Sequence, residues 1–226
     1  ASDVHYGRDS VEEFKKIEMV VKVCGMTDEA NLLAIAIARP DYFGFIFYDK
    51  SPRSITGQSL PTLEGIKKIG VFVDAPLEQI SQRQTQFSLN GIQLHGKEDI
   101  EYIEALKTLL PGEVTIFKAI SVYDANDIKS VNDFEDYVDV IILDTKTPLK
   151  GGSGKQFDWD LLQYYQAELP FLLSGGISAE DADELFKLKS RFPQMIGVDI
   201  NSKFETRPGL KQVDQTISFI NKLKSE

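Results

Sequence analysis

The chain has 226 residues, of which 42% are hydrophobic and 27% charged, as expected for a globular protein. Its formal net charge is −10 and its Lys and Arg residues are scattered, which excludes an evident basic face for nucleic acid. The single cysteine, Cys24, excludes internal disulfides. No apolar run approaches the ~20 residues of a membrane span, and the N-terminus has no apolar leader. We therefore expect a cytoplasmic protein with no nucleic-acid or membrane partner.

Residues 1–19 form an N-terminal extension that precedes the first strand-like run. Ser10 and Glu13 have the spacing of a capping box, and Val11, Phe14 and Ile17 fall on one helical face. This pattern predicts a short helix packed under the main domain rather than a functional arm. We place the main domain at residues 20–226.

Eight short apolar runs follow, spaced by about 22 to 30 residues, which is the length of one strand, one helix and two loops. Most gaps between them show helical periodicity, as Ile100, Ile103 and Leu106 illustrate. Later gaps carry the same signal at Leu161 with Tyr165. The runs lie at Val20–Cys24, Tyr42–Phe47, Ile69–Val73, Gly91–Leu94, Val114–Ile120, Val138–Leu143, Phe171–Leu173 and Met195–Ile200.

The second gap differs from the others, because Gly57, Pro61 and Gly65 stand where a helix is expected. Such residues break helices, so the helix after strand two is predicted to be short or missing. Eight β–α alternations without a domain-sized linker favour a closed (β/α)8 TIM barrel over an open doubly wound sheet. The first strand is followed by no G-x-G-x-x-G pattern, which agrees with this choice.

In a parallel barrel, functional side chains lie at or just beyond the carboxyl ends of the strands. The sequence places ionisable or small residues at most of these ends. Asp144 is the most prominent, because it ends a buried strand and precedes a glycine-rich loop. The candidate positions are Cys24, Arg53, Gln93, His95, Asp144, Gly175, Gly176, Asp199 and Ser202.

Two glycine-rich segments have different interpretations. Gly175 and Gly176 precede Ser178, a plausible N-cap, and follow strand seven, where barrels often bind phosphate on exposed backbone N–H groups. A tight turn is the plain alternative, but the position favours phosphate. The run Gly151–Lys155 does not have the spacing of a P-loop, so we interpret it as a mobile lid that includes Gly154.

Taken singly, the two most reactive side chains have ordinary explanations. A lone Cys24 is most often a buried structural cysteine, and Asp144 could cap a helix or pair with a cation. Their positions at the mouth of the barrel raise the odds of a catalytic role. A metal site is not expected, because His5 and His95 are the only histidines and no Cys/His cluster exists.

Segments at nearly all strand ends match one known family in the right order, over residues 20 to 224. The chain resembles the phosphoribosylanthranilate isomerases, the single-domain barrel enzymes of tryptophan biosynthesis. The segments that begin at Lys22 and at Gln93 are together the most specific to this family. The matching segments are Lys22-Val-Cys-Gly-Met-Thr27, Gly44-Phe-Ile-Phe-Tyr48, Ser51-Pro-Arg53, Gln93-Leu-His-Gly96, Leu143-Asp-Thr-Lys146, Gly151-Gly-Ser-Gly154, Leu173-Ser-Gly-Gly176 and Gly197-Val-Asp199.

The resemblance implies an Amadori rearrangement of N-(5′-phosphoribosyl)anthranilate to 1-(o-carboxyphenylamino)-1-deoxyribulose 5-phosphate, without metal or organic cofactor. It implies Asp144 as the general acid and Cys24 as the general base, roles that suit a carboxyl group and a thiolate. Arg53 would face the anthranilate carboxylate, as its planar fork allows. The remaining implied contacts are Gln93, His95 and Asp199 along the pocket and Gly154, Gly175, Gly176 and Ser202 at the phosphate.

The sequence departs from the family pattern after strand eight, where Asn201 replaces a serine and Lys203 replaces a glycine. Two other functions stay open. One is the related aminoimidazole isomerase of histidine biosynthesis, which has an aspartate where Cys24 stands. The other is a sugar-phosphate binding barrel without catalysis, which has no need of Cys24, Asp144 and Arg53 together. The partner expected is a small-molecule substrate, and the chain is expected to be a monomer or a homodimer.

Overall fold

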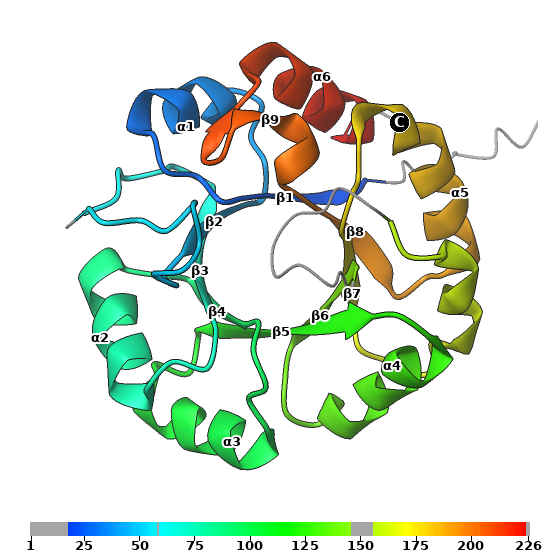
Figure 1. Ribbon diagram of the computed structural model, residues 1–226, viewed down its shortest axis with the longest axis horizontal. Coiled ribbons are helices and arrows are strands. Elements are labelled where there is room, and N and C mark those ends of the chain that lie inside the picture. Colours follow the sequence, from blue (N-terminus) through cyan, green and yellow to red (C-terminus); the bar gives the residue numbers. More distant parts are fainter. Residues whose placement is uncertain (1–17, 58, 146–155, 225–226) are drawn as a thin grey trace, which may run out of the picture.

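The computed structural model describes residues 18–57, 59–145 and 156–224. The expected glycine-rich lid, Gly154 included, lies outside these residues, and so does the expected extension helix except for residues 18 and 19. Eight parallel strands close into a barrel in sequence order, with helices around the outside (Figure 1). The strands are β1 Val20–Cys24, β2 Tyr42–Ile46, β3 Lys67–Phe72, β4 Gly91–Leu94, β5 Thr115–Val122, β6 Val140–Thr145, β7 Phe171–Ser174 and β8 Met195–Ile200.

Two apolar layers hold the barrel together, and the period-two alternation of the strands assigns each residue to one of them. On β6, Val140 and Ile142 belong to the cluster inside the barrel, whereas Ile141 and Leu143 belong to the layer beneath the helices. All four side chains are at least 93% buried, since strands covered on both faces consist of continuous apolar runs. The inside of the barrel is thus filled with side chains and only its ends are open to chemistry.

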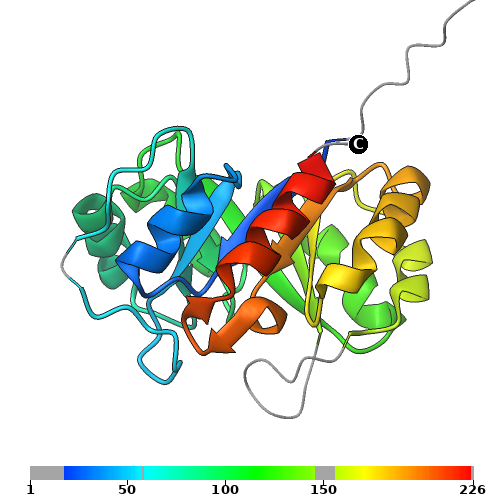
Figure 2. The same ribbon diagram turned by 90° about the horizontal axis from the view of Figure 1, so that it is seen from above.

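The helices pack on the outer layer, as Figure 2 shows from the side. Side-chain caps fix three of their N-termini: Asp28 accepts from the backbone N–H of Asn31, Asp99 from that of Tyr102, and Asp124 from that of Asn126. The α-helices are α1 Glu29–Ala36, α2 Leu77–Phe87, α3 Ile100–Leu109, α4 Ala125–Lys129, α5 Ala182–Arg191 and α6 Val213–Lys224. The 3-10 helices are η1 Ser130–Phe134, η2 Trp159–Tyr164, η3 Ala179–Asp181 and η4 Ser202–Phe204, and a small hairpin consists of β9 Glu205–Arg207 and β10 Leu210–Lys211.

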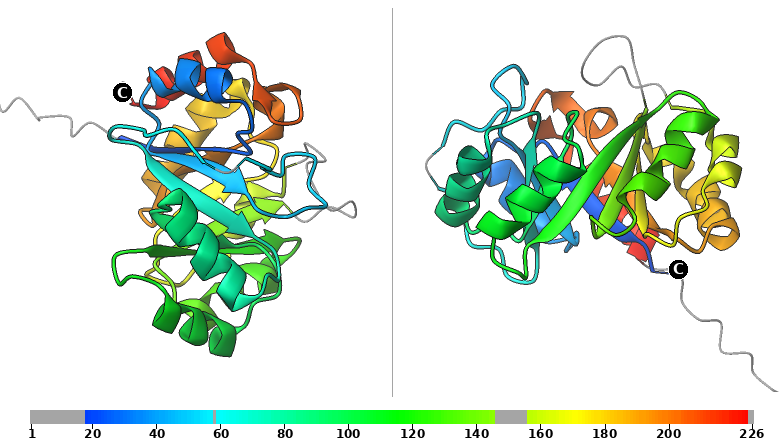
Figure 3. Two further views of the ribbon diagram at one scale, coloured as in Figure 1. Left: turned by 90° about the vertical axis from the view of Figure 1, so that its left-hand side faces the viewer. Right: turned by 90° about the horizontal axis from the view of Figure 1, so that it is seen from below.

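The connection between β2 and β3 contains no helix in its described residues, 47–57 and 59–66, as the glycines and the proline predict. In the left view of Figure 3, extended chain crosses β2 and β3 between α1 and α2. The connection begins with a loop that returns to β2. There Ser54 forms a β-bridge with Ile46, and the N–H of Ile55 donates to the carbonyl of Ile46 at 3.0 Å. This return fixes the loop that carries Arg53.

The closed (β/α)8 architecture is confirmed, with differences in detail. The helix predicted around Leu161 and Tyr165 is the 3-10 helix η2. Strand six, predicted to end at Leu143, continues to Thr145 because Asp144 and Thr145 pair with Ser121 and Val122 of β5. In the described residues, no helix combines the length and apolar character needed to cross a membrane.

Candidate active site

Strand alternation turns four of the predicted residues toward the axis of the barrel. On β1, Val21 and Val23 pack outward, so the alternate residue Cys24 faces inward. The same argument turns Gln93, Asp144 and Asp199 inward, because their neighbours Leu94, Leu143 and Val198 belong to the outer layer. All four residues lie near the carboxyl ends of their strands. The sequence therefore brings together, at one mouth of the barrel, groups that are up to 175 residues apart.

Cys24 is a free thiol, 5% exposed, on the last residue of β1. Its register partner on β2 is Gly44, and a Cβ at Gly44 would stand 2.6 Å from the sulfur. The same Cβ would stand 3.1 Å from Nζ of Lys22, so the Lys22 ammonium lies beside the thiol. Burial raises the pKa of the thiol above its ordinary value, while the charges of Lys22 and Lys211 oppose that rise and the carboxylate of Asp199 adds to it. The thiol thus lies in a dry site with two cations beside it.

Asp144 lies across the mouth on β6, where its side chain is 27% exposed. Its Oδ2 is 3.4 Å from Nε2 of His95, and Nδ1 of His95 is 2.9 Å from Nε2 of Gln93. With Gln93 donating to Nδ1, the neutral ring carries its proton on Nε2, the nitrogen that faces Asp144. Gln93 and His95 thus orient the carboxyl group from β4 and from the residue just beyond it.

Asp199 on β8 joins the two sides of the mouth. Its Oδ2 accepts a hydrogen bond from Nζ of Lys22 at 2.8 Å, and Lys22 is its register partner across β1 and β8. Its Oδ1 is buried and has no partner among the described residues. Asp144 and His95 lie close enough for their charges to act on it. A buried carboxylate oxygen without a donor can accept a hydrogen bond from a hydroxyl group of a ligand.

Arg53 is held at the rim by Glu205 of β9. The guanidinium Nε lies 2.9 Å and 3.0 Å from the two carboxylate oxygens, and Nη2 lies 2.7 Å from Oε2. Lys211 of β10 donates to the same carboxylate at 2.6 Å and to Oδ1 of Asn201 at 2.7 Å. Burial favours the neutral form of Glu205, but the hydrogen bonds from Arg53 and Lys211 outweigh it and lower its pKa. Arg53 still has one guanidinium nitrogen to offer a carboxylate of a ligand.

Gly175 and Gly176 follow β7 with φ values of +85° and +72°. A Cβ on Gly175 would collide with the side chain and backbone of Thr145, so this position needs glycine for the close approach as well as for its φ. The turn leads into η3, where Ser178 and Asp181 form a capping box. Ser202 begins η4 on the neighbouring strand end. The glycine pair and Ser202 therefore stand on adjacent strands, as the phosphate hypothesis requires.

Some expected features lie elsewhere or outside the described residues. Gly154 and the predicted lid fall within residues 146–155, which the structure does not describe. Within the described ranges, no group of three or more His, Cys, Asp or Glu side chains could hold a metal ion. Lys203, which replaces the family glycine, is exposed on η4, and its charge acts on Glu180 of η3.

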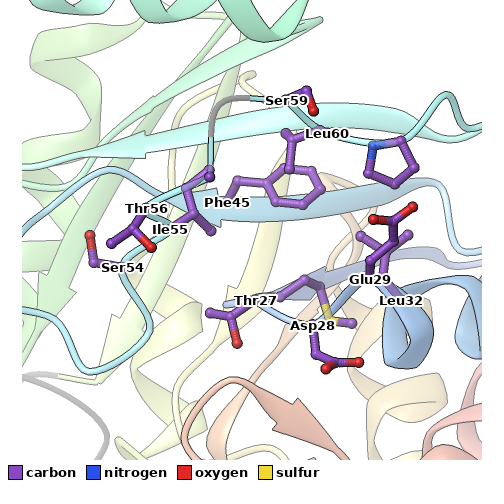
Figure 4. Close-up of a pocket in the computed structure, with 13 residues that line it drawn as sticks. Thr27, Asp28, Glu29, Leu32, Phe45, Ser54, Ile55, Thr56, Ser59 and Leu60 are labelled. Atoms are coloured by element: carbon purple, nitrogen blue, oxygen red, sulfur yellow. The ribbon is translucent and has the colours of Figure 1, made fainter.

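A cavity of about 260 Å³ lies beside the mouth, between the end of β1 and the chain that replaces helix two (Figure 4). Thr27 and Asp28 form one wall, and Ile55, Thr56 and Leu60 form the other. Cys24, Asp144 and Arg53 do not line it. The cavity borders the described part of the connection between β2 and β3 and is separate from the inward-facing groups.

Sequence reasoning missed the charged residues that support the site. Lys22, Lys211 and Glu205 are buried at the mouth, yet none of them is among the positions predicted for the site. One signal was present for Lys22, a lysine in the otherwise apolar strand Val20–Cys24, because a charge inside a buried strand needs a partner. Glu205 and Lys211 gave no such signal, since both lie in a hairpin whose position depends on the closed barrel.

The closed barrel, with a thiol and a carboxyl group turned inward from β1 and β6 at the carboxyl ends of the strands, is the architecture of a (β/α)8-barrel enzyme. A family profile described as N-(5′-phosphoribosyl)anthranilate (PRA) isomerase matches residues 21–222. The chain therefore belongs to the phosphoribosylanthranilate isomerase family, which acts in tryptophan biosynthesis, and the prediction of an isomerase is confirmed. The histidine-pathway and non-catalytic alternatives are thereby set aside.

Similar proteins support the assignment. The N-(5′-phosphoribosyl)anthranilate isomerase of Parabacteroides distasonis is 37% identical over 211 residues, which cover 91% of this chain and 93% of that protein. A crystal structure of phosphoribosyl anthranilate isomerase with reduced 1-(o-carboxyphenylamino)-1-deoxyribulose 5-phosphate superposes with a TM-score of 0.74 at 27% identity, covering 92% and 100% of the chains. Monomers generated from the dimeric isomerase of Thermotoga maritima give a TM-score of 0.75 at 28% identity, covering 92% and 100%.

Proposed function

We propose that this chain converts N-(5′-phosphoribosyl)anthranilate to 1-(o-carboxyphenylamino)-1-deoxyribulose 5-phosphate, with Asp144 as general acid and Cys24 as general base. The observation that carries the proposal is the inward orientation of both groups at the same mouth, on β1 and β6 of a closed ring. The substrate follows from the family and from the solved relative that binds the reduced product.

The first step opens the ribose ring. The Asp144 carboxyl group gives a proton to the ring oxygen as the C1′–O4′ bond breaks and its electron pair moves to that oxygen. The nitrogen lone pair forms the C1′=N bond of a protonated Schiff base. His95, 3.4 Å from the carboxyl group, holds it in place for this transfer.

The second step removes the proton from C2′. The Cys24 thiolate takes this proton, and the electron pair forms a C1′=C2′ bond while the Schiff base nitrogen becomes neutral. The resulting enol tautomerises to the 2′-ketone, so atoms and electrons balance without an external oxidant. Asp199 offers its unpartnered Oδ1 to a sugar hydroxyl on the same side of the mouth.

The remaining contacts orient the two ends of the substrate. Arg53, fixed by Glu205, faces the anthranilate carboxylate, and Gln93 lines the pocket beside His95. Backbone N–H groups after Gly175 and Gly176, with Ser202, receive the phosphate. Gly154 is proposed as a further phosphate contact from sequence alone. We further propose that the enzyme is cytoplasmic and works as a monomer or a homodimer, since dimeric and monomeric forms both occur in a solved relative.

Steady-state kinetics on Asp144→Asn and Cys24→Ser test the two roles, with fluorescence of the anthranilate group as the signal. Asp144→Asn should abolish turnover and Cys24→Ser should reduce it severely, while substrate affinity largely survives both. Asp139→Asn is the matched control, because Asp139 precedes the opposite end of β6 and accepts from the N–H of Ile116 at 2.7 Å. Equal rates in the wild type and both variants refute the roles, and a wild type without turnover refutes the function.

A further inference from the structure

Lys22 is a charged residue at a position where the fold offers it no water. It is 0% exposed, and strand alternation points it into the barrel between the outward-facing Val21 and Val23. A buried ammonium costs several kcal/mol in desolvation, so burial without a use would favour an apolar side chain here. The role of this lysine therefore has to be sought in what its ammonium contacts.

Two groups meet the ammonium, and the sheet register brings both to it. Asp199, its partner across β1 and β8, accepts a hydrogen bond at 2.8 Å. Cys24, two residues further along the inner face of β1, lies close enough for the two charges to act on each other. A Cβ at Gly44 would stand 2.6 Å from the Cys24 sulfur and 3.1 Å from Nζ of Lys22, so the missing side chain at Gly44 leaves the space in which thiol and ammonium meet.

We propose that Lys22 is a positioning residue of the active site: its ammonium, held by Asp199 at the closure of the barrel, is the counter-ion that stabilises the Cys24 thiolate. This inference rests on the proposed role of Cys24 as the general base, since a base in a dry site must carry its negative charge before it takes a proton. A buried thiol with no cation beside it stays protonated at neutral pH and therefore cannot accept a proton from the substrate.

The electrostatics around the thiol agree with this role. Burial raises the pKa of Cys24, and Lys22 is the strongest of the neighbours that lower it. Burial alone would lower the pKa of Lys22, but the charges of Asp199 and Cys24 outweigh it and raise the pKa, so the ammonium stays protonated. The charged and titratable groups that face this part of the mouth are Lys22, Asp199, Lys211, Glu205, Arg53, Asp144 and His95.

Because Cys24 is the only cysteine of the chain, its ionisation can be measured directly. The ultraviolet absorbance of the thiolate is recorded against pH, and the same variant with Cys24→Ser is subtracted to remove the tyrosines. Lys22→Met should raise the thiol pKa by at least about one unit, which lowers the thiolate fraction at neutral pH about tenfold. Asp199→Asn should shift the thiol pKa in the opposite direction, since it removes a negative charge from the same cluster.

The opposite signs separate this role from a merely structural one. If Lys22 and Asp199 only tie β1 to β8, both substitutions loosen the mouth and move the thiol pKa in the same direction or not at all, and either result overturns the proposal. Lys118→Met is the matched control, because Lys118 is 3% exposed, pairs with Glu98 at 2.9 Å and faces the outer layer of β5. It should leave the titration of Cys24 unchanged.

A double variant keeps the test open if Lys22→Met leaves Asp199 unpaired and unfolds the protein. Lys22→Met with Asp199→Asn removes both charges, and the thiol pKa should still rise, because the charge of Lys22 acts on the sulfur more strongly than that of Asp199. A double variant with an unchanged or lowered thiol pKa overturns the proposal. The catalytic role of Cys24 is judged separately: if Cys24→Ser keeps full turnover, the general-base assignment fails while the titration still reports on Lys22.

Discussion

Gly44→Ala is expected to disable the enzyme without unfolding it, because the new methyl group enters the space occupied by the sulfur of Cys24. The added Cβ would stand 2.6 Å from the sulfur, whereas ordinary contact begins at 3.4 Å. The sulfur must therefore retreat by about 0.8 Å, the difference between these two distances. A misplacement of about 1 Å in a reacting group costs about 100-fold in rate, or about 2.7 kcal/mol of transition-state stabilisation.

The loss should appear in kcat, with KM changed little, because the proposed substrate contacts at Arg53 and at the glycine turn are not displaced. Steady-state fluorescence kinetics measure both constants, and thermal unfolding shows that the variant folds. Gly112→Ala is the matched control, since nothing lies within 4 Å of a Cβ at Gly112, and it should retain full activity. Wild-type kcat in a folded Gly44→Ala protein would refute the placement of the thiol.

Three further outcomes are expected. Arg53→Ala should mainly raise KM, because it removes a contact already made with the bound substrate, and an unchanged KM contradicts that contact. Glu205 has a lowered pKa in the fold, so its stabilisation is present above the ordinary glutamate pKa and is lost as pH falls through the folded value. The stability gap between wild type and Glu205→Gln, from urea unfolding, should therefore shrink on acidification; a constant gap argues against the clamp on Arg53 and Lys211. Leu185 lies on the buried face of α5, so Leu185→Ala should lower the free energy of unfolding, measured in urea, by about 2–5 kcal/mol. Leu33→Ala, at a side chain that is 47% exposed, should lower it by about 0.5 kcal/mol or less. Equal losses in the two variants would contradict the packing of Leu185 in the core.

The strands could be predicted from sequence because each is a short apolar run between polar segments. β1, β4 and β8 begin and end at the predicted residues. Boundaries elsewhere moved by one to two residues, since pairing with the neighbouring strand decides where a strand ends. β6 illustrates this, because its pairing with β5 carries it through Asp144 to Thr145. The missing helix two was equally visible, because glycine and proline act locally.

The site was visible only in part, and the difference has a physical cause. Cys24, Asp144 and Arg53 stand at strand ends or in a loop, where type and position suffice to suggest chemistry. The supporting ions depend on pairings across the whole chain: Arg53 meets Glu205 over 152 positions, and Asn31 accepts from the N–H of Lys211 over 180. Local periodicity carries no information on such pairs, so the buried charged residues that support the site became apparent only in the structure of the closed barrel.

The ring closes between the first strand and the last, and Lys22 lies 177 positions from Asp199. During translation the thiol is made 175 residues before the carboxylate that anchors its cation. The complete mouth can therefore form only after β8 has been made. A chain that terminates before β8 carries an unpaired β1 edge and an unanchored lysine, so this architecture yields no partly assembled catalyst.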